Sequence, residues 1–89
     1  MVYYKSKHSN HMNLKQIGNN QSLVSFNNGA QVLFSYETPV AGYLPDEGYF
    51  KTEQFFSKTT TKHVNSFLQD VNKVQLVKQS FIEGITNDK

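Results

Sequence analysis

The chain has 89 residues, a hydrophobic share of 37% and a formal net charge of +2. At this length a folded chain buries only about 60–65% of the surface that its unfolded form exposes, so we expect one core and no deep catalytic cavity. The absence of cysteine excludes disulfides, thiolate metal sites and cysteine nucleophiles. The composition therefore favours a small non-enzymatic domain without a cofactor.

All nine basic residues are lysine, and arginine is absent. Because the planar guanidinium group supplies the bidentate contacts that read guanine, this composition argues against sequence-specific reading of DNA. No segment approaches the ~20 apolar residues of a membrane span, and the N-terminus lacks the apolar run of a signal peptide. We expect a cytoplasmic protein without membrane contact.

The two ends of the chain differ from its middle. Residues 1–11 (MVYYKSKHSNH) show no hydrophobic period, so we expect a flexible N-terminal arm or leader there. In this interpretation a single domain spans residues 12–86 and a disordered tail spans residues 87–89.

The segments LKQIG, SLVSF and AQVLFSY, within residues 14–36, are short and rich in β-branched or aromatic residues, which predicts strands. The turn at Asn27–Gly29 decides which residues face inward. A two-residue loop would place Phe26 opposite Gln31 and mix the two faces, whereas a three-residue loop closed by its glycine pairs Phe26 with Ala30. We favour the three-residue loop. It places on one face Val24, Phe26, Ala30, Val32, Phe34 and Tyr36.

The strand pattern continues after this hairpin. VAGYL reaches a turn at Pro45–Gly48, with proline at the second position of the turn and glycine available for positive φ, and residues 49–53 return as a strand. The predicted fold class is α+β, with an antiparallel β-meander of four to five strands packed against one amphipathic helix.

Four apolar residues after the meander recur at the helical spacing i, i+3, i+4 and i+7: Val64, Phe67, Leu68 and Val71. This stripe predicts a helix that lies across the apolar face of the sheet. Among the hydroxyl residues before it, Thr60 is the predicted N-cap. Residues 73–78 (KVQLVK) indicate a short edge strand, and Ser80–Glu83 has the spacing of a capping box that opens a last helical turn before Gly84.

The segments LKQIGNN, VLFSYETPVAGY, YFKTE and above all SKTTTKHVNSFL resemble a family of short uncharacterised proteins that is common in tailed phages. In that family a strand pattern LFSY-TPVA precedes T-T-(S/T)-(K/R)-H-(I/V)-N and an aromatic-Leu pair. The resemblance runs from about Leu14 to Phe81 and is sharpest over Thr59–Asn65. Thr61 stands where serine is more usual, and the N-terminal arm lies outside the pattern. The resemblance implies a phage or phage-derived source and no particular activity. With that source we expect a phage-type accessory protein in the host cytoplasm.

The start of the predicted helix combines hydroxyls with cations. A helix N-terminus carries unpaired N–H groups and a partial positive charge, which normally attract aspartate or glutamate. Cations there are unfavourable unless an anion such as phosphate joins them. We hypothesise a site for an anion or nucleic acid at Ser57, Lys58, Thr59, Thr60, Thr61, Lys62, His63 and Asn65. The competing interpretation is that the threonines only cap the helix and the cations are solvated.

Three aromatic residues, Phe55, Tyr43 and Tyr49, are candidates for stacking on nucleobases, and core packing is the competing interpretation. His63 is the one histidine within the predicted domain, residues 12–86. Because no second ligand lies at helical spacing from it, no metal site is expected.

These patterns favour a non-enzymatic binding module that contacts nucleic-acid backbone without sequence preference. The alternative is a protein–protein interaction module that inhibits or modulates a host or phage protein, through a sheet edge or the acidic residues 46–53, and it includes a homodimer. A nucleotide enzyme that uses His63 as a base is a third hypothesis.

Overall fold

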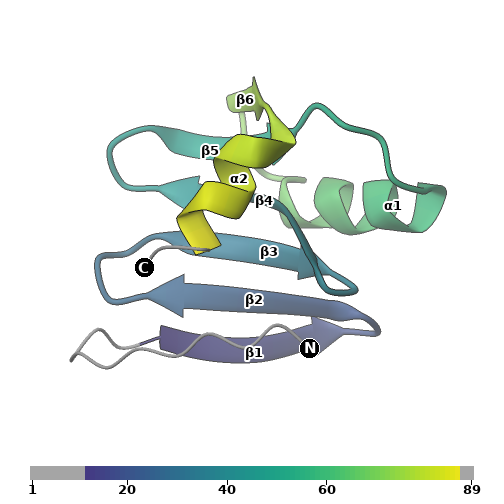
Figure 1. Ribbon diagram of the computed structural model, residues 1–89, viewed down its shortest axis with the longest axis horizontal. Coiled ribbons are helices and arrows are strands. Elements are labelled where there is room, and N and C mark those ends of the chain that lie inside the picture. Colours follow the sequence, from purple (N-terminus) through teal and green to yellow (C-terminus); the bar gives the residue numbers. More distant parts are fainter. Residues whose placement is uncertain (1–11, 87–89) are drawn as a thin grey trace.

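The structure, a computed structural model, describes residues 12–86 as a six-stranded sheet with two helices. The strand order follows the chain from β1 to β6 (Figure 1). The strands are β1 (Met12–Gly18), β2 (Gln21–Phe26), β3 (Gln31–Ser35), β4 (Thr38–Leu44), β5 (Gly48–Thr52) and β6 (Val74–Val77), and the helices are α1 (Lys58–Phe67) and α2 (Gln79–Thr86). The coarse α+β class is confirmed. The predicted arm and tail, residues 1–11 and 87–89, lie outside the described residues.

The first five strands form the predicted antiparallel meander. β6 pairs with β5 in parallel, so the sheet is mixed and has six strands. The prediction of four to five antiparallel strands is therefore wrong for the sheet as a whole, because the edge strand predicted within residues 73–78 joins it as a sixth, parallel strand. Parallel neighbours need a long crossover, which α1 and its flanking segments supply. The short apolar run of β6 indicates a strand but carries no information about its direction.

The three-residue turn after β2 is confirmed. Phe26 N–H donates to the carbonyl oxygen of Ala30 at 2.8 Å, and Gly29, with φ of 95°, donates to the carbonyl oxygen of Phe26 at 3.0 Å. Val24 consequently lies opposite Val32. The prediction that Tyr36 lies on the apolar face is wrong, because this residue lies in the turn after β3 with φ of 59° and is exposed.

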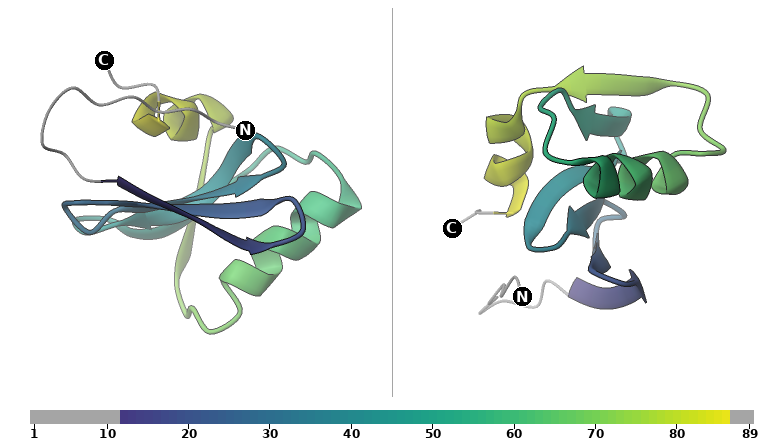
Figure 2. Two further views of the ribbon diagram at one scale, coloured as in Figure 1. Left: turned by 90° about the horizontal axis from the view of Figure 1, so that it is seen from below. Right: turned by 90° about the vertical axis from the view of Figure 1, so that its right-hand side faces the viewer.

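The two helices cover opposite faces of the sheet (Figure 2). On the predicted apolar face, the helix that packs is α2, through Ile82. The cluster on that face contains Val24, Val32, Phe34, Phe50 and Ile82. On the other face, the cluster below α1 contains Leu33, Val40, Ala41, Val64 and Leu68. The prediction of one helix over the first face is wrong, since β3 and β4 are apolar on both faces.

Both helices depart from their predicted ends. The stripe of α1 is confirmed, although Val71 packs from the turn after the helix, where its N–H donates to the carbonyl oxygen of Leu68. α2 begins at Gln79 and continues through Gly84 to Thr86, so Ser80 does not open it and Gly84 does not end it. Full burial of Ile82 offsets the cost of about 1 kcal/mol for a helical glycine. Neither helix is long and apolar enough to cross a membrane.

Candidate functional site

Ser57, and not Thr60, is the N-cap of α1. Thr60 N–H donates to Ser57 Oγ at 3.1 Å, and Ser57 has extended backbone. Thr61 Oγ1 donates to the carbonyl oxygen of Ser57 at 3.0 Å. The predicted cap is wrong because Thr60 points towards the sheet, where it is buried. Both residues have hydroxyls suited to capping, so their types alone do not distinguish them.

A buried polar network joins β3 to α1. Ser35 Oγ lies 2.9 Å from Thr60 Oγ1 and 2.8 Å from His63 Nδ1, and all three residues are buried. Ser57 Oγ donates to Thr60 Oγ1 at 3.2 Å. Ser35 was not predicted as part of this site. The one signal for it is a hydroxyl inside the apolar run VLFSY.

The predicted anion site is thus largely engaged with the protein itself. The hydroxyls of Ser57, Thr60 and Thr61 all have internal partners. Its remaining members are exposed, apart from the buried His63: Lys58, Thr59, Lys62 and Asn65. An anion would have to compete for the hydroxyls that already cap the helix or bind Ser35. The geometry is that of a capped helix with solvated lysines, and anion binding stays a prediction.

The structure brings together two of the three predicted stacking residues. The ring centroids of Tyr43 and Tyr49 lie 4.8 Å apart, and Phe67 of α1 lies 6.1 Å from Tyr49. Phe55 belongs to the segment between β5 and α1 instead and is 71% exposed. Partial burial of Tyr43 and Tyr49 in this cluster agrees with packing against the core.

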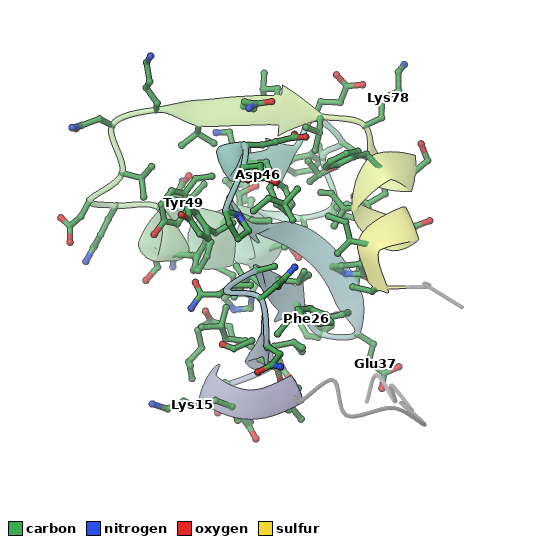
Figure 3. All side chains as sticks on the ribbon, turned by 90° about the vertical axis from the view of Figure 1, so that its left-hand side faces the viewer. Lys15, Phe26, Glu37, Asp46, Tyr49 and Lys78 are labelled. Atoms are coloured by element: carbon green, nitrogen blue, oxygen red, sulfur yellow. The ribbon has the colours of Figure 1, made fainter. Side chains whose placement is uncertain are left out.

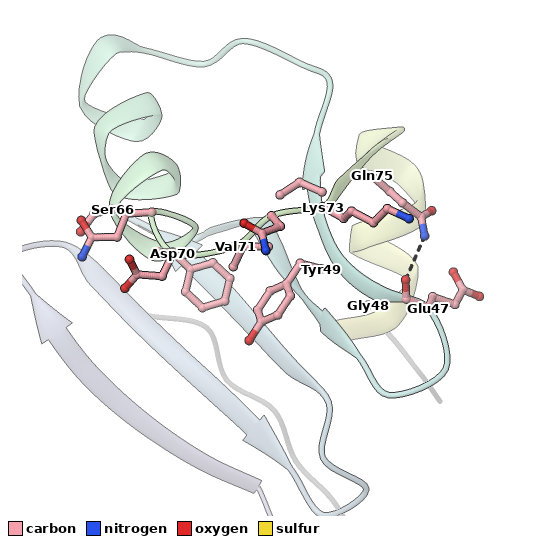
Figure 4. Close-up of a pocket in the computed structure, with 12 residues that line it drawn as sticks. Glu47, Gly48, Tyr49, Ser66, Asp70, Val71, Lys73 and Gln75 are labelled. Atoms are coloured by element: carbon pink, nitrogen blue, oxygen red, sulfur yellow. Dashed lines mark hydrogen bonds between the residues drawn. The ribbon is translucent and has the colours of Figure 1, made fainter.

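An open hollow of about 1150 Å³ lies beside this cluster, between the end of α1 and the starts of β5 and β6 (Figure 4). Tyr49 and Phe67 line it together with Asp70 and Lys73. At one side, Gln75 Nε2 donates to the carbonyl oxygen of Glu47 at 3.0 Å. Within residues 12–86 no group of three or more histidine, aspartate or glutamate residues could hold a metal ion.

A second depression, of about 260 Å³, lies between α1, the segment before it and the strands β5 and β6. Three exposed apolar residues line it, with Phe55 at 71%, Leu76 at 62% and Phe56 at 37% exposure. We call these three residues and the depression between them the apolar groove. Asn65 of α1 and Lys51 of β5 also line it.

β6 borders the apolar groove and is the last strand of the sheet formed by residues 12–86 (Figure 1). The carbonyl oxygen of Val77 accepts the N–H of Glu53 at 2.9 Å, so the main-chain groups of Val77 face β5. Because main-chain directions alternate along a strand, the N–H and C=O groups of Val74 and Leu76 face outward. Two exposed lysines, Lys73 and Lys78, flank the strand; Lys78 projects outward at its end (Figure 3).

Comparison with known proteins assigns the family. Residues 12–84 match the model of DUF8033, a family of unknown function. No curated protein and no solved structure matches the chain. The match begins at the first residue of β1 and includes both helices up to Gly84. The chain therefore belongs to the DUF8033 family.

Proposed function

We propose that this protein is a non-enzymatic protein–protein interaction module, which binds an extended apolar segment of a partner protein in the apolar groove beside β6. The exposure of Phe55 and Leu76 in one groove is the observation that supports the proposal. Burying a large apolar side chain contributes about 1.5–3 kcal/mol, so a partner that covers both residues gains several kcal/mol. Neighbouring exposed apolar residues of this kind are typical of interaction sites.

The contacts at the start of α1 give less support to nucleic-acid binding. Contacts to phosphate need exposed cationic side chains. At the start of α1 the exposed cationic side chains are those of two lysines, Lys58 and Lys62. If nucleic acid were the partner, binding would weaken with salt, and a Lys58→Ala/Lys62→Ala variant would show a flatter salt dependence. Filter binding at low salt separates this function from the proposed one.

The role of a phage-type accessory protein is part of the proposal and rests on the resemblance of SKTTTKHVNSFL to proteins common in tailed phages. A module of this size carries out such a role by occupying a surface of a host or phage protein. The groove is small, so we expect it to accept a short segment of the partner and not a broad surface.

The experiment is a selection of random twelve-residue peptides on the immobilised protein, followed by affinity measurements on the enriched peptides. A Phe55→Ser/Leu76→Ser variant should bind them about tenfold more weakly or worse. A Leu14→Ser/Ile17→Ser variant is the matched control, because these residues are exposed on β1 at the opposite edge of the sheet. The control should bind as the unaltered protein does. No enriched peptide, or equal binding by both variants, would contradict the proposal.

A further inference from the structure

We infer that the bound segment joins the sheet as a further strand beside β6 and carries acidic side chains at both ends of the paired stretch. This inference rests on the proposed function and specifies its partner. It assigns the main chain of β6 a part in binding, in addition to the side chains of the apolar groove.

The outer edge of β6 has the main-chain groups that strand addition needs. Val74 and Leu76 each direct one N–H and one C=O outward, since Val77 faces β5 through its bond with Glu53. Within residues 12–86 no strand pairs with these groups. An extended peptide that pairs with such an edge gains affinity from main-chain hydrogen bonds and specificity from alternate side chains.

The apolar groove lies on one face of this edge. Leu76 is the neighbour of Lys51 in the parallel register, and both line the groove together with Phe55. Side chains of an added strand alternate between the two faces of the sheet, so every second one lies on the face of Leu76 and Phe55. We therefore expect apolar residues at alternate positions of the bound segment.

The charges at this edge favour an acidic segment. Lys73 and Lys78 lie next to an added strand, about 5 Å away across the ladder, whereas Glu47 and Glu53 at the ends of β5 lie one strand further, at about 10 Å. The nearer lysines dominate, because interactions of exposed charges are largely screened beyond about 8 Å at physiological salt.

The same lysines favour an acidic segment over a second copy of this chain as the partner. A twofold dimer through β6 would be centred on Gln75 or Leu76. In the first case Lys78 of one copy faces Asn72 of the other and Lys73 faces Val77; in the second case Lys78 faces Val74 and Lys73 faces Gln79. Neither register places a carboxylate directly opposite these lysines, whereas opposite charges across a strand pair are favourable, so an acidic segment suits this edge better than a second copy.

The other edge of the sheet is less suited to strand addition. Lys15 stands in the middle of β1, and the register of β1 shifts between Gln16 and Gly18. A central lysine and an irregularity of this kind are the features that block edge pairing in natural sheets. β6 has neither within Val74–Val77, so we assign the added strand to β6.

Two variants at one position isolate the main-chain contribution. Leu76→Ala and Leu76→Pro both remove the apolar side chain, but only proline also removes the outward N–H. Proline is tolerated on an edge strand where its N–H would face solvent, so both variants should fold. The peptides enriched on the unaltered protein should bind Leu76→Pro about tenfold more weakly than Leu76→Ala. Replacing their acidic residues by lysine should weaken binding by a similar factor.

Hydrogen exchange on the unaltered protein supplies a second measurement that depends on no variant. Addition of an enriched peptide should slow exchange of the Leu76 amide and leave that of Val77, which faces β5, little changed. Equal affinities of Leu76→Pro and Leu76→Ala, no slowing at Leu76, or no effect of the acidic residues would overturn the inference. The proposed function would stand in those cases if binding still required Phe55 and Leu76. The proposed function would fail together with the inference if no peptide were enriched or if the Phe55→Ser/Leu76→Ser variant bound as the unaltered protein does.

Discussion

Ser35 Oγ lies 2.8 Å from His63 Nδ1, and this contact fixes the middle of α1 to the end of β3. The same oxygen lies 2.9 Å from Thr60 Oγ1, one turn earlier in the helix. Apolar contacts alone would let a helix slide along a sheet, whereas a pair of directional contacts specifies its position. Because α1 forms one wall of the apolar groove, this buried contact also determines the shape of the groove.

Replacement of Ser35 by alanine should destabilise the protein. The change leaves His63 Nδ1 and one side of Thr60 Oγ1 without this buried partner, which should lower the free energy of unfolding by about 1–3 kcal/mol. Urea denaturation measures the loss. Ser66→Ala, at an exposed position of α1, is the control and should change stability by less than about 0.5 kcal/mol. A loss at Ser35 no larger than the control would show that the network contributes nothing to stability.

The cap of α1 gives a separate prediction. Ser57→Ala removes the acceptor of the Thr60 N–H and should cost about 1 kcal/mol. Thr59→Ala, at an exposed position within the first turn, is the matched control and should be neutral or slightly stabilising, since alanine has the higher helix propensity. Thermal unfolding followed by circular dichroism compares the two. If both variants melt together, Ser57 does not stabilise the helix.

The sequence predicted those features that depend on neighbouring residues. The length of the turn Asn27–Gly29 and its closing glycine determine how β2 pairs with β3. The spacing of Val64, Phe67 and Leu68 identifies α1 from the local sequence alone. The features that it failed to predict depend on residues far apart. Which face of the sheet each helix covers, and which hydroxyl faces Ser35, follow from a sheet with two apolar faces and a crossover between β5 and β6.

The candidate site divides in the same way. Its hydroxyls and lysines were identified by residue type, but their partners are set by tertiary contacts, so a pattern typical of anion binding coincides with a capped helix. Phe55 was predicted as a stacking residue because it is aromatic. Its position beside Leu76 follows from the return of the chain to the sheet as β6, which composition does not encode.

Tyr36 offers a test of backbone strain. Its φ of 59° lies in the left-handed region, which bulky residues rarely adopt, at a cost of about 1–3 kcal/mol. Asparagine tolerates this region, so Tyr36→Asn should be neutral or stabilising by up to about 1 kcal/mol, whereas Tyr36→Val should be clearly destabilising. Chemical denaturation of both variants gives the difference. A loss on Tyr36→Asn as large as that on Tyr36→Val would mean that the Tyr36 ring, 6.0 Å from the ring of His63, offsets the strain by its contacts.

Two glycines should respond to alanine in opposite directions. At Gly42, a Cβ atom would meet the carbonyl oxygen of Gln31 and lie 2.6 Å from Phe50 Cζ. The Phe50 ring occupies the space above Gly42, its direct neighbour in the sheet, and is buried in the core cluster, so it has little room to move. Gly42→Ala should therefore lower the free energy of unfolding by about 1–3 kcal/mol.

Gly84 is the matched control for that substitution. It lies within α2, and apart from its chain neighbours and the backbone of its own helix no atom lies within 4 Å of a Cβ placed there. Alanine should restore helix propensity and raise stability by about 0.5–1 kcal/mol, because glycine loses more conformational freedom on folding. The same methyl group is added in both variants, so opposite signs separate the close contacts at Gly42, with Phe50 and the Gln31 carbonyl oxygen, from the effect on the unfolded chain. A stabilising Gly42→Ala would show that β4 and Phe50 can separate at little cost, and that the core on this face is less tightly packed than the contacts indicate.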